Sequence, residues 1–398
     1  MKLPVYMDYH ATTPVDQRVV DAMMPYFTAH FGNAASKQHS YGWTAEAAVE
    51  HARQTIARTI NADANEIIFT SGATESNNLA LKGVAENFRS RGNHIITVQT
   101  EHRSVLDVCR NLEERGFEVT CLPVDGNGLV NVDDIRRAMT AGTILVSVMM
   151  ANNEIGTIAP IAEIGKLCAE HGIIFHTDAT QAVGKISVDV QAMNIHLMSF
   201  SAHKVYGPKG IGALYVRSKN PYVKLLPQID GGGHERGMRS GTLNVPAIVG
   251  FGKAVQLAAE NLENESARIS RLRNMLEHRF MNIEETRING HPAMRLHNNL
   301  NVTFSNVPAD DLMMALRNDV ALSSGSACTS ADPEAGKVSH VLKAIGLDDE
   351  HARCSVRFGL GRFTTEEEVR FVAERVTKAV EEIRRKSPAR LIAERELA

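Results

Sequence analysis

Residues 172–181 have the sequence Gly-Ile-Ile-Phe-His-Thr-Asp-Ala-Thr-Gln, and residues 195–204 have the sequence Ile-His-Leu-Met-Ser-Phe-Ser-Ala-His-Lys. Each segment is a short apolar run that ends in polar, chemically reactive side chains. In an α/β protein such runs are buried parallel strands, and ligands bind beyond their carboxyl ends. The two segments therefore predict that Asp178 and Lys204 lie close together at the ligand-binding edge of a sheet.

An acid and a lysine in these positions suit pyridoxal phosphate. A lysine can bind the aldehyde covalently, and an aspartate can keep the pyridine nitrogen protonated so that the ring accepts electrons. Two such side chains can also form a purely structural ion pair. This pair of segments by itself leaves both interpretations open.

The composition is that of an ordinary soluble globular protein. The 398 residues are 43% hydrophobic and 22% charged with a net charge of −3, which gives no support for nucleic acid or an anionic membrane as the main partner. The five cysteines are scattered without a Cys-x-x-Cys pair, which fits a reducing compartment. No apolar run approaches 18 residues and the N-terminus shows no signal or transit pattern, so we expect a cytoplasmic protein.

Strand-like and helical segments alternate over residues 15–255, which predicts a large α/β domain with a mostly parallel sheet covered on both faces. The expected strands include residues 66–69, 94–98, 117–122 and 143–149, and the expected helices include residues 104–115 and 161–171.

The pattern changes after residue 255. A long helical stretch at 254–281 leads into strand-like segments at 299–304, 320–323 and 355–358. We therefore predict a smaller α+β domain made of residues 1–14 and 256–398. Its last helix is expected to begin at a capping box of Thr364 and Glu367 and to bury one stripe of apolar residues: Val369, Val372, Val376, Val380 and Ile383.

Residues 70–77, Thr-Ser-Gly-Ala-Thr-Glu-Ser-Asn, lie between an expected strand and an expected helix. Gly72 permits a tight turn, and the hydroxyl groups with the first helix amides can hold a phosphate. Alternatively, Ser71 or Thr74 simply caps the helix. No Walker loop and no Gly-x-Gly-x-x-Gly follows a strand, so the nucleotide-binding folds lack their fingerprints.

Other polar groups follow further strand ends. His102 can stack on a cofactor ring or relay a proton, although a capping role explains it as well. Asn153, after Asn152, can bond a ring substituent, or the pair can form a plain turn. The planar fork of Arg357 suits the carboxylate of an amino-acid substrate, with a surface salt bridge as the alternative.

Cys328 lies in Ser-Ser-Gly-Ser-Ala-Cys-Thr-Ser, residues 323–330, a segment almost without apolar anchors. A thiolate needs access and a polar setting, so a cysteine in such a loop is expected to be reactive. Cys109, Cys121 and Cys168 fall within expected helices or strands and are expected in the core.

Together these segments resemble the cysteine desulfurases, the NifS/IscS group of fold-type-I pyridoxal phosphate enzymes in aminotransferase class V. The resemblance runs from residue 6 to about residue 363 in the family's order. The matching motifs occupy residues 11–14, 71–77, 203–210, 237–242 and 323–330. The last of them separates this group from ordinary class-V aminotransferases, which need no loop cysteine.

The resemblance implies a homodimer and a role for each matching residue. Lys204 would hold pyridoxal phosphate, Asp178 would face the pyridinium nitrogen, and His102 would stack on the ring and take part in catalysis. The resemblance also places Gln181 and Asn153 near the ring hydroxyl, and Asn153 and Arg357 at the substrate. The phosphate would be held by Thr74, Ser201 and His203 together with Thr242 of the partner subunit. Ala73 and Ala202 would also lie in the cofactor site.

The implied activity is conversion of L-cysteine to L-alanine, with the sulfur held as a persulfide on Cys328. The sulfur would pass to iron–sulfur cluster assembly, tRNA thiolation or another thiocofactor pathway, through acceptor proteins such as a cluster scaffold. No metal of the chain's own is implied, although Cys328 could ligate a nascent iron–sulfur cluster transiently with the scaffold.

Two departures from the family pattern stand out. Ala202 occupies a position where the family usually has glycine, and its methyl group should fit unless the residue needs a positive φ. The chain ends in Glu-Leu-Ala at residues 396–398, unlike the family's longer docking segment, which leaves the sulfur acceptor open. The alternatives to a cysteine desulfurase are two other enzymes, a class-V aminotransferase and a selenocysteine lyase. A further alternative is a non-catalytic sulfur carrier or regulatory protein that binds pyridoxal phosphate.

Overall fold

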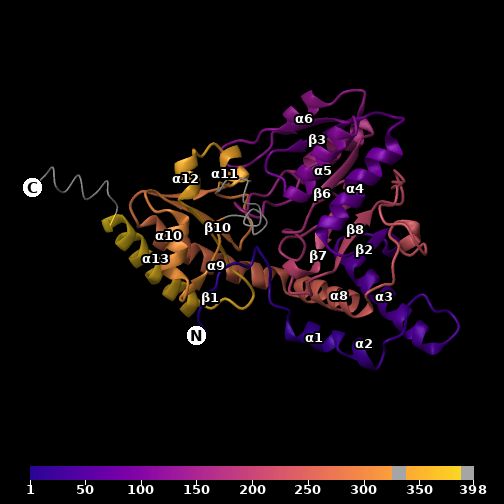
Figure 1. Cartoon of the computed structure of the whole chain (residues 1–398), viewed down its shortest axis with the longest axis horizontal. Coiled ribbons are helices and arrows are strands. Elements are labelled where there is room, and N and C mark those ends of the chain that lie inside the picture. The colour runs from indigo at the N-terminus through magenta and orange to yellow at the C-terminus, as the bar shows by residue number, and fades with distance from the viewer. Residues whose placement is uncertain (325–337, 387–398) are drawn as a thin grey trace, which may run out of the picture.

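The computed structural model describes residues 1–324 and 338–386. A seven-stranded sheet with the order β2-β8-β7-β6-β5-β3-β4 forms the centre of the larger half of the molecule (Figure 1). Its strands are β2 (Ile67–Thr70), β3 (His94–Val98), β4 (Glu118–Leu122), β5 (Thr143–Ser147), β6 (Ile174–Asp178), β7 (Leu197–Ser201) and β8 (Gly212–Val216). The pairs from β4 across to β7 are all parallel. The predicted mostly parallel α/β sheet is confirmed.

The strand β8 is the exception, because it runs antiparallel to both β7 and β2. Only the short 3-10 turn η2 (Ala202–Lys204) and residues 205–211 join β7 to β8. A parallel neighbouring strand would need a longer crossover, usually through a helix. Because this connection is short, the next strand pairs antiparallel with β7. The expected alternation of strand and helix is wrong at this point.

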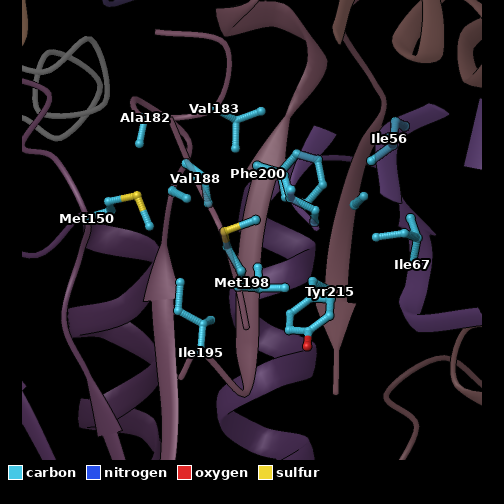
Figure 2. Packing of buried hydrophobic residues seen from close by; sticks show 14 of the residues in the cluster. Ile56, Ile67, Met150, Ala182, Val183, Val188, Ile195, Met198, Phe200 and Tyr215 are labelled. Carbon is cyan, nitrogen blue, oxygen red and sulfur yellow. The ribbon is translucent and has the colours of Figure 1, made fainter. Parts of the chain in front are cut away.

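Helices cover both faces of this sheet, as the alternation of buried strand residues requires. On one face, α3 (Ser40–Thr59), α7 (Ile161–His171) and α8 (Val245–Glu260) share an apolar cluster with Phe175 and Phe200. On the other face, α4 (Ala73–Phe88) and α5 (Arg103–Glu114) share a cluster with Ile174 and Leu197. Figure 2 shows the first face, where Met198 and Phe200 lie near Tyr215. Smaller elements complete this half: α1 (Gln17–Met23), α2 (Pro25–Thr28), η1 (Ala64–Glu66), α6 (Val132–Ala138) and η3 (Glu235–Gly237).

The smaller half is built on an antiparallel sheet of β9 (Thr286–Asn289), β10 (Asn299–Phe304) and β12 (Ser355–Gly359). Three helices pack on it: α9 (Leu262–Met281), α10 (Ala309–Leu316) and α13 (Glu366–Lys386) (Figure 1). β1 (Val5–Tyr6) pairs with β11 (Val320–Ala321), so the chain start packs in the same apolar cluster as the C-terminal elements. The remaining helices are α11 (His340–Ala344) and α12 (Asp349–Arg353). The domain boundaries at residues 15 and 255 stay predictions.

The helical stretch expected at 254–281 consists of two helices, because Asn261 ends α8 and begins α9. Two other local predictions are wrong. The capping box of α13 lies one residue later than predicted, since the backbone N–H of Glu368 donates to Thr365 Oγ1 at 3.2 Å and that of Thr365 donates to Glu368 Oε2 at 2.9 Å. Cys121 is exposed because β4 is the edge strand of the large sheet.

Across the described residues, no helix is both long enough and apolar enough to cross a bilayer.

Candidate active site

A cavity of about 590 Å³ lies beyond the carboxyl ends of β6 and β7, a volume typical of small-molecule sites. Its lining brings together most of the candidate residues: Ala73, Thr74, His102, Asn153, Asp178, Gln181, Ser201, His203, Lys204 and Arg357. Ala202 and Thr242 are not part of this lining, and Cys328 lies outside the described residues.

Asp178 and Lys204 reach the cavity from neighbouring parallel strands. Asp178 ends β6, and Lys204 ends the η2 turn that follows β7. The Asp178 carboxylate accepts hydrogen bonds from the Asn77 amide, at 2.8 Å, and from the backbone N–H of Thr180, at 2.9 Å. Lys204 Nζ donates to the backbone oxygen of His10 at 2.6 Å. The two groups therefore line one cavity, and neither of these bonds joins them to each other.

The N-terminus of α4 forms another wall, with residues 71–74 in the lining. Gly72 is the N-cap residue, and no side chain caps this 16-residue helix. The Ser71 N–H instead donates to Glu75 Oε2 at 2.8 Å. Backbone N–H groups at an uncapped helix N-terminus attract an anion. The alternative in which Ser71 or Thr74 caps the helix is wrong.

His102 both caps a helix and lines the cavity. It is the N-cap residue of α5, where its Nδ1 accepts the backbone N–H of Ser104 at 3.1 Å. The same ring lines the cavity. The fold therefore holds this histidine at a helix end that faces the site.

The two adjacent asparagines differ in position, since Asn152 forms a turn and Asn153 lines the cavity. Asn152 forms the turn, because its Oδ1 accepts the backbone N–H groups of Glu154 at 2.8 Å and Ile155 at 3.0 Å. Asn153 lines the cavity, and its backbone oxygen accepts a hydrogen bond from Arg357 Nη1 at 2.9 Å.

Arg357 lies on β12 and is only 1% exposed, so the interpretation as a surface salt bridge is wrong. Its Nη2 donates to Asp8 Oδ1 at 2.7 Å and to Ser323 Oγ at 2.9 Å. Because Asp8 and Asn153 hold the guanidinium from two sides, the smaller half of the molecule presents a fixed cation to the cavity.

Basic groups lie in the cavity and beside it. Burial, Lys204 and Lys209 lower the pKa of His203 to about 3, so this imidazole is neutral. Burial, followed by Lys204 and Arg357, lowers the pKa of Lys185 to about 7. An anionic ligand in the cavity would relieve this concentration of positive charge.

Sequence reasoning missed three polar residues near the site. Asn77 bonds Asp178, and it lies in the motif at residues 70–77, one helical turn after Ala73. Lys185 Nζ donates to Gln181 Oε1 at 2.7 Å, a pair whose spacing of four residues was available as a signal. His10 lies 3.1 Å from the same Gln181 oxygen, and nothing in its local sequence indicates this contact.

Ala202 is fully buried and does not have a positive φ. Its methyl group lies next to Gly207, where a Cβ atom would come within 2.8 Å of it. The missing side chain at Gly207 thus leaves room for the methyl group at position 202.

Within residues 1–324 and 338–386, no three His, Cys, Asp or Glu side chains gather in a way that could hold a metal ion.

Residues 5–372 match the model of the class-V aminotransferase family. The cysteine desulfurase IscS of Methylococcus capsulatus is 54% identical over 388 residues, which cover 98% of this chain and 95% of the relative. The cysteine desulfurase IscS of Glaesserella parasuis is 56% identical over 392 residues, with 98% and 95% covered.

This chain belongs to the cysteine desulfurases of the class-V aminotransferase family. Solved structures of similar proteins support the same family assignment. A NifS-like protein superposes with a TM-score of 0.88 at 36% identity, covering 95% of this chain and 100% of that one. The protein SspA in complex with cysteine superposes with a TM-score of 0.79 at 39% identity, covering 91% and 100%. The predicted family and its fold-type-I architecture are confirmed.

Proposed function

We propose that this member of the family is a pyridoxal phosphate-dependent cysteine desulfurase that converts L-cysteine to L-alanine. The observation that carries the proposal is the 590 Å³ cavity lined at once by Asp178, Lys204 and the uncapped N-terminus of α4. The identities above 50% to proteins named cysteine desulfurase favour this activity over transamination.

The residues present fit pyridoxal phosphate in three respects. Lys204 supplies the amine that would hold the cofactor, and the buried carboxylate of Asp178 would pair with its ring nitrogen. The α4 amides, Thr74, Ser201 and His203 would hold its phosphate, joined by Thr242 of the partner subunit. His102 would stack on the ring, and Gln181 with Asn153 would lie near the ring hydroxyl. When bound, the cofactor supplies an electron sink for the bond-breaking steps at the substrate.

The remaining chemistry belongs to side chains of this chain. Arg357 would bind the substrate carboxylate through its planar fork, while its bonds to Asp8 and Asn153 fix its orientation. Lys204 would take the proton from the substrate Cα as a general base.

Cys328, which lies outside the described residues, would accept the sulfur. Its thiolate would form an S–S bond with the substrate sulfur while the substrate Cβ–S bond breaks. The electron pair of the broken bond stays with the carbon skeleton, which takes up a proton to give alanine. The products are then alanine and a persulfide on the protein, and no external oxidant or reductant is needed.

The proposed assembly is a homodimer. Large apolar side chains are more than half exposed between the end of α1 and the start of α3, and we call these residues the N-terminal apolar surface: Met24, Phe27, Phe31, Tyr41 and Trp43. Contiguous exposed apolar residues of this kind favour a protein contact. In Figure 1, α1 and α2 lie along the outer edge of the larger half. A second copy of the chain packed there would also explain why Thr242 does not line the cavity of its own chain.

We propose that the persulfide sulfur goes to an acceptor protein in iron–sulfur cluster assembly, tRNA thiolation or another thiocofactor pathway. Residues 396–398, where the chain ends unlike the family's docking segment, lie outside the described residues.

The test measures alanine, protein-bound persulfide and cofactor absorbance for the purified protein with pyridoxal phosphate and L-cysteine. We expect Lys204→Ala to form no alanine. Cys328→Ser should bind the cofactor and change its absorbance with cysteine, yet form neither persulfide nor alanine in turnover. Cys121→Ser, which changes an exposed cysteine on the edge strand β4, is the matched control and should keep all three properties. Continued desulfuration by Cys328→Ser would contradict the role given to that thiol.

A further inference from the structure

A chain of hydrogen bonds joins the Asp178 carboxylate to the His102 ring through two other side chains. Asn77 on α4 is fully buried. Its amide nitrogen donates to Asp178 Oδ2 at 2.8 Å and to Ser104 Oγ at 2.8 Å. The Ser104 hydroxyl in turn lies 2.8 Å from His102 Nδ1.

The direction of each hydrogen bond in this chain is determined by the available protons. A carboxylate only accepts, so the Asn77 group facing Asp178 must be the amide nitrogen. A flipped amide would set its oxygen against the Asp178 oxygen, and Asn77 Oδ1 has no partner among the described residues that would favour such a flip. Both amide protons of Asn77 are therefore used, one on Asp178 and one on Ser104.

The donors around His102 fix its tautomer in the same way. The Ser104 hydroxyl accepts from Asn77, so its own proton is available for His102 Nδ1. The backbone N–H of Ser104 points at the same ring nitrogen, at 3.1 Å. With two donors directed at Nδ1, that atom is the acceptor of the neutral ring, and the ring proton lies on Nε2.

We propose that Asn77 and Ser104 are positioning residues that hold His102 in its Nε2–H tautomer and tie the ring to the carboxylate of Asp178. The proposal rests on the proposed function in that His102 lines a site where substrate reacts. In this tautomer His102 begins the reaction as a proton donor from Nε2, because neither ring nitrogen is then available to take up a proton from the substrate. The carboxylate that would face the cofactor ring and the imidazole that would stack on it thus share one hydrogen-bond network.

The experiment records ¹⁵N–¹H correlation spectra of histidine-labelled holoenzyme, in which the two tautomers give different cross-peak patterns. The His102 signals are assigned by their loss in His102→Gln. We expect the Nε2–H pattern in the parent protein. In Asn77→Ala the Ser104 hydroxyl loses the amide that donates to it and can accept a proton from the His102 ring instead. A population with the proton on Nδ1 of His102 should therefore appear. Ser104→Ala removes one of the two donors and should shift the population in the same direction.

Steady-state kinetics at saturating pyridoxal phosphate supply the second readout. We expect kcat for alanine formation to fall about tenfold in Asn77→Ala with KM for cysteine nearly unchanged, as for loss of one buried hydrogen bond in the transition state. The matched control is Asn78→Ala, the next residue on α4, whose amide nitrogen donates to the backbone oxygen of Thr74 at 2.9 Å and is not part of this network. It should change neither the tautomer nor kcat.

An unchanged Nε2–H pattern in both Asn77→Ala and Ser104→Ala overturns the proposal, and so does a changed tautomer with an unchanged kcat. Failure of the proposed function gives a different result, namely no alanine from the parent protein. The tautomer measurement needs no turnover, so it tests the network in either case.

Discussion

At the residue scale, two buried cations at and near this site can be compared. Arg357 and Lys185 are both buried, yet they differ in their partners. Arg357 has the Asp8 carboxylate at 2.7 Å, whereas within residues 1–324 and 338–386 Lys185 Nζ has only the neutral amide oxygen of Gln181. A buried cation without a carboxylate partner is costly, so removing the charge at position 185 should change the free energy of unfolding.

Lys185→Met should stabilise the cofactor-free protein, and the gain should depend on pH. The pKa of Lys185 is lowered from 10.5 to about 7, so between these values the unfolded chain binds a proton that the folded chain does not. Folding stability contributed by this group therefore rises with pH across that window, and the penalty is greatest below pH 7. We expect a gain on the order of a few kcal/mol at about pH 6.5 that shrinks towards pH 10.

Urea unfolding at several pH values checks this prediction. Lys224→Met, which changes an exposed lysine, should give a difference that does not vary across the same range. A gain that grows with pH for Lys185→Met would mean that burial does not disfavour the charged form of this lysine.

Arg357→Lys should raise KM for cysteine more than it lowers kcat. The guanidinium uses both terminal nitrogens to reach Asn153, Asp8 and Ser323, and a lysine cannot reproduce this planar arrangement. Loss of the guanidinium contact with the substrate carboxylate is expected to raise KM by about 10- to 100-fold. Arg295→Lys, at a buried arginine that pairs with Glu277 and does not line the cavity, is the matched control. Equal effects of the two substitutions on KM would argue against carboxylate binding by Arg357.

At the element scale, the helix α4 is positioned by its close approach to β8. A Cβ atom at Gly212 would lie 2.7 Å from the Gly72 Cα atom and 2.7 Å from the backbone oxygen of Phe200. Only a glycine at position 212 therefore lets the uncapped helix N-terminus lie directly against the sheet. This contact depends on β8, the strand that the expected alternation of strand and helix did not predict.

Gly212→Ala should weaken binding of pyridoxal phosphate. The added methyl group must push the α4 N-terminus away from the sheet, and a displaced helix end holds an anion less well. We expect Kd for the cofactor to rise at least about tenfold in a titration of the cofactor-free protein. Gly142→Ala, where a Cβ would meet only side-chain atoms at 3.6 Å or more, should leave Kd unchanged. Unaltered affinity in Gly212→Ala would mean that this helix end does not hold the phosphate.

At the scale of the whole molecule, the site draws on both halves of the chain. The large sheet contributes Asp178 and Lys204, while β12 of the smaller half contributes Arg357. Asp8, near the N-terminus, pairs with Arg357 across 349 positions of the sequence. The site is therefore complete only when the N-terminal segment that carries Asp8 packs against β12.

The N-terminal apolar surface predicts the oligomeric state. Phe31→Asp with Trp43→Asp should convert a homodimer into a monomer in sedimentation experiments, because two charges would have to be buried at the contact. The monomer should also bind the cofactor more weakly, since Thr242 of the partner subunit would be lost from the phosphate site. Met314→Asp, at an exposed residue on α10, is the control and should leave the dimer intact. A parent protein that sediments as a monomer would rule out the dimer itself.

Local sequence was sufficient to locate the strand ends and the polar residues beside them. Apolar runs form buried strands, and polar residues just after the carboxyl ends of such strands lie at the edge of the sheet where ligands bind. Asp178, Lys204 and His102 could therefore be found from the local pattern. Local pattern carries no information on contacts between distant segments. The pairing of Asp8 with Arg357, the antiparallel strand β8 against Gly72, and the link from Asn77 through Ser104 to His102 depend on how separate elements pack. These contacts became visible in the tertiary structure alone, because burial and hydrogen-bond partners are properties of the folded arrangement and not of any one segment.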